Sequence, residues 1–349
     1  MLFISKKDFR NLVEGLMSEM TLYGPVKKHG HPAYAEISSF DELVPGMTPT
    51  HLSAKEFFFP PKETLLNFDI EKKEVFPVIQ SKRQAVIGLH SCDIHAIRLM
   101  DAVFSSSTKD PNYLARRENT LLIGTECLPD EYCFCKSIGT MTVQGGFDVF
   151  LHEVKKGYLA RTGSKQGRRV LEKYTNPSPA KEAQLKELVS FKTKKDKKFA
   201  RKINAEPSAL PLIYSGADAS PVWERIGNIC YGCGSCNHVC PTCYCFDVKD
   251  DISPDMKKGA RFRVWDGCTL EDFAKISGGH NFRKTRAERL RHRFNRKFRY
   301  LADRFKGLFC VGCGRCSRTC LVKINITDVT NEISEERAGL AVSAETEHS

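Results

Sequence analysis

The chain has 349 residues, of which 41% are hydrophobic, so it is long enough to bury two hydrophobic cores. It carries 54 Lys and Arg against 42 Asp and Glu, a formal net charge of +12 at pH 7, and it contains 15 cysteines. The N-terminal stretch MLFISKKDFRNLVEGLM lacks the apolar core of a signal peptide, and no apolar run reaches membrane-spanning length. These features exclude a small secreted disulfide scaffold. We therefore expect a cytoplasmic protein without a membrane span, whose cysteines are reduced.

Residues 1–175 are predicted to form a mixed α/β domain. A helix opens this region, capped by Ser5 with Asp8 three residues further on, and its buried stripe is Phe9, Leu12, Val13, Leu16 and Met20. Buried strands are expected at 85–89 (AVIGL), 120–124 (TLLIG) and 147–154 (FDVFLHEV). Asp93 is the expected cap of a helix between the first two strands, which carries Ile97, Met100 and Phe104. This intervening helix favours parallel neighbours in the sheet.

The rest of the chain is predicted to hold a linker, a cysteine-rich domain and a tail. Residues 176–220 are basic, contain one short amphipathic helix near Leu188, and are predicted to be the linker region. The cysteine-rich domain is expected at 221–332 and to be mainly helical. Residues 333–349 are small and polar, so we expect a flexible tail. The predicted fold class is therefore α+β, with the mixed α/β domain first.

A strongly basic helix is predicted at residues 283–306. Its apolar stripe recurs at spacings of four and three and consists of Leu290, Phe294, Phe298, Leu301 and Phe305. We expect an outer basic face with Arg289, Arg293, Arg296 and Lys297, which is either a solvated surface or a docking surface for an acidic redox partner. No RNA-binding motif or helix-turn-helix pattern accompanies the charge, so no nucleic-acid partner is expected.

Eight cysteines form two runs with the spacing C-x2-C-x2-C-x3-C that iron-sulfur clusters use. In two-cluster ferredoxins, the first three cysteines of a run bind one cluster and the fourth completes the other cluster. By this rule the first [4Fe-4S] cluster is held by Cys230, Cys233, Cys236 and Cys320. The second is held by Cys310, Cys313, Cys316 and Cys240. Two zinc sites are disfavoured, because zinc is typically bound by paired C-x2-C arms.

Four cysteines of the N-terminal half suggest a third cluster. Cys92 and Cys127 each follow a predicted strand, and Cys133 and Cys135 come shortly after Cys127. Because the carboxyl ends of neighbouring parallel strands meet at one edge of a sheet, these thiols could converge on a third iron-sulfur cluster. The alternative is that they are buried apolar thiols and a structural loop. Their spacing alone does not decide between the two.

Three further cysteines, Cys243, Cys245 and Cys268, are one thiolate short of a cluster. They could complete a mixed site with the N-terminal cysteines, or lie near the first cluster and tune it. His238 and His280 could serve as non-thiolate ligands, although an isolated histidine is more often a surface or hydrogen-bonded residue. These alternatives stay open.

Several longer motifs carry a family resemblance that covers nearly the whole chain. They are GLHSCDIHAIRLMD and CLPDEYCFCKSIGT in the N-terminal half, and CPTCYCFDV, RFRVWDGC, GGHNFRKTRAERLRHR and CVGCGRC in the C-terminal half. Together they resemble the β subunit of cytoplasmic sulfhydrogenases and the A subunit of anaerobic sulfite reductase. The resemblance implies a helical two-cluster ferredoxin domain. In one departure, Leu321 follows Cys320 where that family usually has proline; because proline is not a ligand, we expect the cluster to be kept.

Motifs for other cofactors do not occur in the sequence: there is no G-x-G-x-x-G, Walker loop, haem attachment motif or paired C-x2-C arms of a nickel-iron site. No catalytic residue is therefore predicted. We expect an electron-transfer subunit that relays single electrons between a flavin-binding subunit, linked to NAD(P)H or ferredoxin, and a metal-containing catalytic subunit of the hydrogenase or sulfur/sulfite reductase type. The alternative is a catalytic sulfur or disulfide reductase that uses a cluster with one non-thiolate corner.

Overall fold

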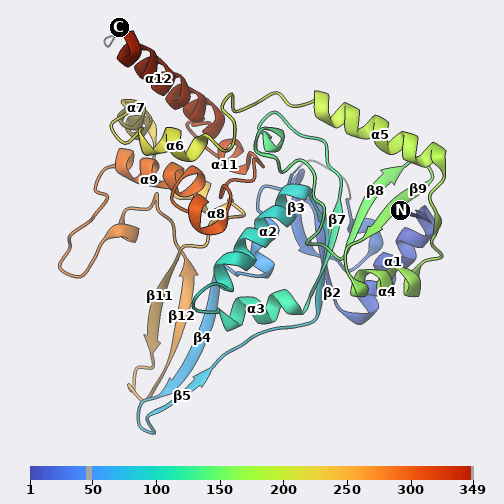
Figure 1. The fold of residues 1–349 in the computed structure, drawn as a ribbon. Helices are drawn as coiled ribbons and strands as arrows, with labels where there is room; N and C mark the ends of the chain where they lie inside the picture. The colour runs from blue at the N-terminus through green and yellow to red at the C-terminus, as the bar shows by residue number, and fades with distance from the viewer. Residues whose placement is uncertain (45–48, 347–349) are drawn as a thin grey trace. The chain divides into compact units, whose positions relative to one another are not determined.

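The structure is a computed structural model that describes residues 1–44 and 49–346. The chain folds into two compact units, and Figure 1 colours it along the sequence. The first unit consists of Met1–Phe59, Ile79–Cys133 and Thr140–Ala200, and the second of Pro60–Val78, Phe134–Gly139 and Arg201–Ser349. The chain therefore contributes to the second unit twice before residue 201. This division differs from the boundaries predicted at 175 and 220.

The first unit is built on an eight-stranded sheet with the order β10-β1-β9-β8-β7-β6-β2-β3. The strands are β1 (Leu2–Ser5), β2 (Thr21–Lys28), β3 (His31–Glu36), β6 (Gln84–Leu89), β7 (Thr120–Thr125), β8 (Val149–Val154), β9 (Gly157–Thr162) and β10 (Ser178–Pro179). Strands β2, β6, β7 and β8 are parallel neighbours, and the remaining pairs are antiparallel. All residues of β6 and β7 are buried, as in sheets covered on both faces. The predicted mixed α/β region is confirmed.

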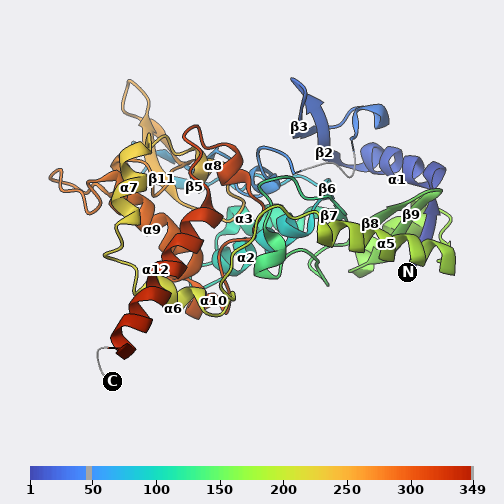
Figure 2. The same ribbon diagram turned by 90° about the horizontal axis from the view of Figure 1, so that it is seen from above.

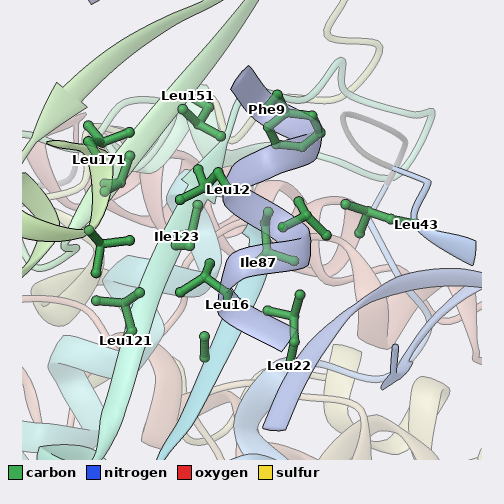
Figure 3. Close-up of a cluster of buried hydrophobic side chains, with 14 of the residues drawn as sticks. Phe9, Leu12, Leu16, Leu22, Leu43, Ile87, Leu121, Ile123, Leu151 and Leu171 are labelled. Carbon is green, nitrogen blue, oxygen red and sulfur yellow. The ribbon is translucent and has the colours of Figure 1, made fainter. Parts of the chain in front are cut away.

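Helix α1 (Lys6–Glu19) packs its apolar stripe against this sheet. The Ser5 hydroxyl accepts a hydrogen bond from the Asp8 N–H at 3.1 Å, and the Asp8 carboxylate accepts one from the Ser5 N–H at 2.9 Å. This reciprocal capping box fixes where the helix begins. Figure 3 shows the α1 side chains among the strand residues of the same core, which include Ile87, Leu121, Ile123 and Leu151. The predicted helix and its buried stripe are confirmed.

The other helices of the first unit are α2 (Ser91–Phe104), α3 (Pro111–Glu118), α4 (Lys165–Tyr174) and α5 (Glu182–Lys197), with 3-10 turns at Phe40–Glu42 and Ala54–Phe57. Helix α5 runs along β8 and β9 in Figures 1 and 2. The sequence predicts Asp93 as the cap of α2, but His90 occupies the cap position. Asp93 lies one turn inside, where its carboxylate accepts a hydrogen bond from the His90 N–H at 3.2 Å. A negative charge in the first turn of a helix stabilises it.

The second unit contains a four-stranded antiparallel sheet. Its order is β11 (Phe246–Ile252), β12 (Lys258–Trp265), β4 (Lys62–Asp69) and β5 (Glu74–Pro77). Strands β4 and β5 come from the region predicted as the N-terminal domain, yet they complete the sheet that β11 and β12 begin, as Figure 1 shows. A hydrophobic pattern within one segment cannot identify such a distant partner.

Helices make up most of the remaining second unit. They are α6 (Leu210–Ser215), α7 (Val222–Ile229), α8 (Ser235–His238), α9 (Arg286–Phe298), α10 (Ala302–Phe305), α11 (Arg315–Arg318) and α12 (Ile326–Thr346), with 3-10 turns at Cys135–Ile138 and Asp272–Ala274. Their core includes Trp223, Phe294 and Phe298. Helices α7 and α9 meet at Gly227, where an added Cβ would lie 2.7 Å from the Ala287 nitrogen, so this close approach requires glycine. The predicted fold class, mixed α/β followed by a helix-rich region, is confirmed.

Three stretches differ in secondary structure from what the sequence predicts. The predicted linker, 176–220, contains α5, which agrees with the short helix expected near Leu188, and also α6, which was not expected. Leu188 of α5 and Leu210 of α6 are buried. The predicted tail belongs to α12 up to residue 346, and Ile333 is fully buried; residues 347–349 lie outside the described residues. The predicted helix 283–306 is divided into α9 and α10, because Arg299 leaves the helical region with φ −130° and ψ −69°.

No helix in the part of the chain that the structure describes is long and apolar enough to cross a membrane.

Candidate functional site

The two cysteine runs adopt the same local structure. In the first run, Gly232 and Gly234 have left-handed backbone angles, with φ of 68° and 75°, and Gly234 caps α8. In the second run, Gly312 and Gly314 have φ of 61° and 69°, and Gly314 caps α11. Side chains with a Cβ are strained at such angles. The glycines therefore let each loop turn tightly between its cysteines.

Polar groups of the first run contact its sulfur atoms directly. The Gly232 N–H donates a hydrogen bond to Cys230 Sγ at 3.3 Å. The Cys233 thiol donates one to Ser235 Oγ at 3.3 Å, and this side chain lowers the pKa of Cys233. Hydrogen bonds to a cysteine sulfur favour the thiolate, which is the form of cysteine that binds iron.

A cavity in the second unit brings Cys320 to the first run. Its lining includes the four residues predicted for the first cluster, Cys230, Cys233, Cys236 and Cys320. Cys316 of the second run lines the same cavity, and the apolar side chains of Leu290 and Phe294 form part of its wall. Thiols from two loops thus meet in a mostly apolar enclosure, which is the surrounding that an iron-sulfur cluster requires.

Leu321 does not displace the cysteine that it follows. The Cys320 sulfur accepts a hydrogen bond from the Ile324 N–H at 3.3 Å, and Leu321 itself is 72% exposed. The position that usually holds proline therefore lies at the surface, where a leucine side chain fits without rearranging the loop.

The four residues predicted for the second cluster also lie in one neighbourhood. Burial raises the pKa of Cys313 to about 11, against the effect of Arg315, and the nearby Cys240 and Cys316 thiols add to the increase. Burial likewise raises the pKa of Cys310, and Cys316 and Cys240 contribute. Cys240 thus lies near the second run, as the crossed arrangement requires. The ligation itself stays a prediction.

The basic residues predicted on the outer face of α9 are in fact largely buried. Arg289, Arg293 and Lys297 are only 5%, 3% and 5% exposed. Arg293 Nη2 donates a hydrogen bond to the Cys236 carbonyl oxygen at 3.3 Å, and Lys297 Nζ donates one to Thr242 Oγ1 at 2.8 Å. The prediction of an outward basic face at these positions is therefore wrong.

The buried cations lie against the cysteine loops. Burial alone would lower the pKa of Arg293, but the neighbouring Cys236 and Cys316 thiols raise it well above its usual value. Arg296, the fourth residue predicted to face outward, is half-buried with its guanidinium 4.9 Å from the centre of the Tyr244 ring. The cysteine loops thus cover a face that composition alone would assign to solvent.

Cys243, Cys245 and Cys268 lie beside the first run. Asn237 Nδ2 donates hydrogen bonds to Cys268 Sγ at 3.3 Å and to Cys243 Sγ at 3.8 Å. Burial raises the pKa of Cys245, and the Cys268 thiol adds to the increase. These three thiols therefore share one neighbourhood beside the first run. Both a tuning role near the first cluster and a mixed site with the N-terminal cysteines stay predictions.

The two histidines considered as ligands differ in their surroundings. The His238 ring stacks on Trp265, with 6.3 Å between ring centres. His280 is exposed, and its ring contacts Phe282 edge-on at 4.9 Å. Both contacts fit the ordinary role of a histidine that packs against an aromatic ring.

The four N-terminal cysteines are all buried. Cys92, Cys127 and Cys133 belong to the first unit, and Cys135 belongs to the second, where the backbone of Gly312 packs closely on it. Burial opposes ionisation of Cys127, but His90 lowers its pKa below the usual value. A third cluster held by these four residues stays a prediction.

Within residues 1–44 and 49–346, no group of three or more His, Cys, Asp or Glu side chains gathers around a point where a single metal ion could sit.

Two comparisons with known proteins decide the family. The model of the 4Fe-4S dicluster domain matches residues 229–324. Sulfhydrogenase 2 subunit beta of Pyrococcus furiosus is 40% identical over 315 residues, which cover 90% of this chain and 92% of that protein. The chain belongs to the sulfhydrogenase β-subunit family. No solved structure matches it.

Membership of this family confirms the resemblance that the sequence motifs carry. The dicluster domain implies two [4Fe-4S] clusters, and its limits enclose both cysteine runs. The left-handed glycines and the cavity that Cys320 lines together with the first run fit these clusters. The sulfhydrogenase β-subunit homologue is thus an iron-sulfur protein whose domain implies electron transfer.

Sequence reasoning missed two polar residues beside the thiols. Asn237 is 1% exposed and contacts two sulfur atoms, and Thr242 is 1% exposed with its hydroxyl 3.4 Å from Cys240 Sγ. Both residues lie within the motif CNHVCPTC, between or next to cysteines. A small polar side chain inside a ligand run is the signal that could have identified them, because groups there reach the sulfurs.

Proposed function

We propose that the chain is the electron-transfer iron-sulfur subunit of a multi-subunit oxidoreductase. The observation that carries this proposal is the cavity at Cys230, Cys233, Cys236 and Cys320, which Cys316 of the second set also lines. Ligand sets that share a wall place their two sites next to each other, which fits a path for electrons. Each [4Fe-4S] cluster, when bound, supplies one-electron redox chemistry.

The residues of this chain have separate roles in the proposal. The crossed sets hold the clusters: Cys230, Cys233, Cys236 and Cys320 the first, and Cys310, Cys313, Cys316 and Cys240 the second. The apolar wall at Leu290 and Phe294 excludes water from the first site. Peptide N–H groups such as that of Gly232 donate to the sulfurs and stabilise their negative charge.

The proposed partners are a flavin-binding subunit linked to NAD(P)H or ferredoxin, and a metal-containing catalytic subunit. The name of the Pyrococcus furiosus relative describes one subunit of a larger enzyme. The present sequence has neither a nucleotide-binding fingerprint nor the cysteine arms of a nickel-iron site. An electron relay needs both a donor and an acceptor, so we expect both partners to co-purify with the chain from its native source.

A second candidate function is catalysis of sulfur or disulfide reduction by this chain itself. It is favoured by Cys243 and Cys268, which lie outside the two ligand sets and are both contacted by Asn237. A cluster at these thiols would have a non-thiolate corner, and such a corner could bind a sulfur atom of the substrate.

The two functions can be separated with the purified chain, its clusters intact and its partners absent. An electron relay should exchange electrons with a viologen dye but turn over neither polysulfide nor sulfite. Substrate turnover that is lost in Cys243→Ser/Cys268→Ser, with dye reduction unchanged, would favour the catalytic reductase. Inability of the intact clusters to exchange electrons with any viologen would contradict the relay proposal.

A further inference from the structure

Helix α9 carries three buried cations at a spacing of four residues. Arg289, Arg293 and Lys297 are each at most 5% exposed. Within the described part of the chain, none of them pairs with a carboxylate, and the Nε atoms of both arginines have no hydrogen-bond partner. Burying a charge without a counter-charge costs several kcal/mol, on the order of the whole net stability of a domain. A row of three therefore indicates that negative charge is bound beside it.

Each cation lies at a different place along the two ligand sets. Arg289 lies at the first loop: its Nη2 is 3.8 Å from where a Cβ on Gly232 would stand. Arg293 lines the cavity of the first set and donates to the Cys236 carbonyl. Since four residues advance a helix by about 6 Å, the row extends along both sites.

Lys297 lies at the second set. Its ammonium donates to Thr242 Oγ1, and the same hydroxyl lies 3.4 Å from the Cys240 sulfur. One hydroxyl group therefore connects the Lys297 ammonium to the sulfur that the second cluster would use.

We propose that the cationic row of α9 sets the reduction potentials of the two clusters, with Arg293 acting on both and Lys297 acting mainly on the second. Reduction brings one electron from an external donor to a cluster and adds one negative charge there. A fixed positive charge nearby stabilises the reduced form more than the oxidised form, so it raises the potential. The proposed step transfers one electron and no proton. This inference rests on the proposed function, since it presumes that the clusters change redox state.

The test is a potentiometric titration of the full chain, followed by the paramagnetic signals of the reduced clusters. Lys297→Met keeps the length of the side chain without the charge, and Lys297→Arg keeps the charge. We expect Lys297→Met to lower the reduction potential of one cluster by at least about 59 mV, which is a tenfold change in the one-electron equilibrium constant. The potential of the other cluster should change less. Lys297→Arg should stay close to the wild type. Arg293→Met should lower both potentials.

The matched control is Arg291→Met, which removes one positive charge from the same helix. Arg291 is half-buried on another face and donates to the Asp218 carbonyl at 2.7 Å, so both potentials should be unchanged. Equal potentials in Lys297→Met and the wild type, at full iron content, would overturn the proposal. So would a shift in Lys297→Arg as large as in Lys297→Met.

Two further results keep the interpretation unambiguous. If neither Lys297→Met nor Arg293→Met retains full iron, the row is needed to hold the clusters rather than to set their potentials, and the proposal is wrong. If the potentials shift as expected but the native complex passes no electrons through this chain, the proposed relay fails while the role of α9 stands.

Discussion

Glu63 and Arg263 form a buried ion pair that joins strands β4 and β12. Arg263 Nε donates to Glu63 Oε1 at 2.5 Å, and each side chain is 2% exposed. The two residues are direct cross-strand neighbours although they are 200 positions apart in the sequence. The pair thus fastens an N-terminal segment into the sheet of the second unit.

Removing the carboxylate should destabilise this sheet strongly. Glu63→Ala removes a buried carboxylate that contacts the buried Arg263 guanidinium, and we expect a loss of about 3–5 kcal/mol in the free energy of unfolding of the second unit. Urea unfolding followed by circular dichroism measures it. The control is Asp250→Ala, which breaks the exposed ion pair between Asp250 of β11 and Arg261 of β12. This substitution should change the free energy of unfolding little. If the two substitutions lowered the free energy of unfolding equally, burial would not be what makes the Glu63–Arg263 pair important.

Crossed ligation predicts which cysteine substitutions act alike. Cys320→Ala should perturb the same paramagnetic signal as Cys233→Ala, because both residues line the first cavity. Cys240→Ala should group instead with Cys313→Ala. Electron paramagnetic resonance of the reduced variants distinguishes the two signals. If Cys320→Ala grouped with Cys313→Ala, each run would close its own cluster.

Features set by neighbouring residues could be predicted from the sequence. The capping box of Ser5 and Asp8 and the stripe from Phe9 to Leu16 depend on spacings within one helix, and the structure contains both. The same is true of the cysteine runs, whose fixed spacing indicated the dicluster domain that the family comparison confirms. In each case the interacting groups are separated by only a few positions.

Features that depend on distant segments could not be predicted. Nothing near Glu63 indicates that its partner is Arg263, so the sheet of the second unit was not expected. From the helix sequence alone, the row from Arg289 to Lys297 is predicted to be a solvated face. The thiols that lie against it belong to loops elsewhere in the chain, which the helix sequence does not reveal. Whether a charged side chain is buried depends on which segment packs on it. The hydrophobic pattern of a helix describes the helix itself and not that segment.

A third cluster at the N-terminal cysteines would appear in the iron content. Anaerobically purified protein should contain about eight irons with two clusters and about twelve if Cys92, Cys127, Cys133 and Cys135 hold another. Cys133→Ser/Cys135→Ser should then lose about four irons, with the signals of the two ferredoxin-type clusters unchanged. The control is Cys133→Ala alone, which should lose the same irons. Iron content that stays constant in both variants would exclude the third cluster.

Docking of a redox partner by the basic segment must be tested at residues that do face solvent. Lys284, Arg286 and Lys306 are exposed near α9 and α10, whereas Arg289, Arg293 and Lys297 are not. Reversing the three exposed charges to Glu should slow electron transfer to one partner on the order of tenfold at low salt, because steering by opposite charge is lost. Stopped-flow kinetics measure the rate, and added salt should imitate the effect in the wild type.

The matched control for docking reverses Lys192, Lys194 and Lys197, which are exposed on α5. It changes the net charge equally but at another surface. If both triple variants slow transfer to the same extent, net charge rather than a docking surface is responsible. If neither does, the basic segment is only a solvated face.

His292 of α9 should make stability depend on pH. Burial lowers its pKa to about 4, and the positive charges of Arg283 and Arg296 contribute, whereas an unfolded histidine titrates near 6.5. Between these values the unfolded chain binds more protons than the folded chain, so the free energy of unfolding falls as pH falls from about 6.5 towards 4. The stabilising contribution is complete above pH 6.5. Because the ring is half-exposed, solvent screening limits the effect to at most about 2 kcal/mol.

His292→Gln tests this dependence, because glutamine stays neutral throughout the range. Urea unfolding at pH 7.5 and pH 5.5 should show a smaller difference in the free energy of unfolding for the variant than for the wild type. His280→Gln is the control, because it makes the same substitution at an exposed histidine. A His292→Gln variant that loses as much stability as the wild type between the two pH values would show that the ring is protonated equally easily in both states.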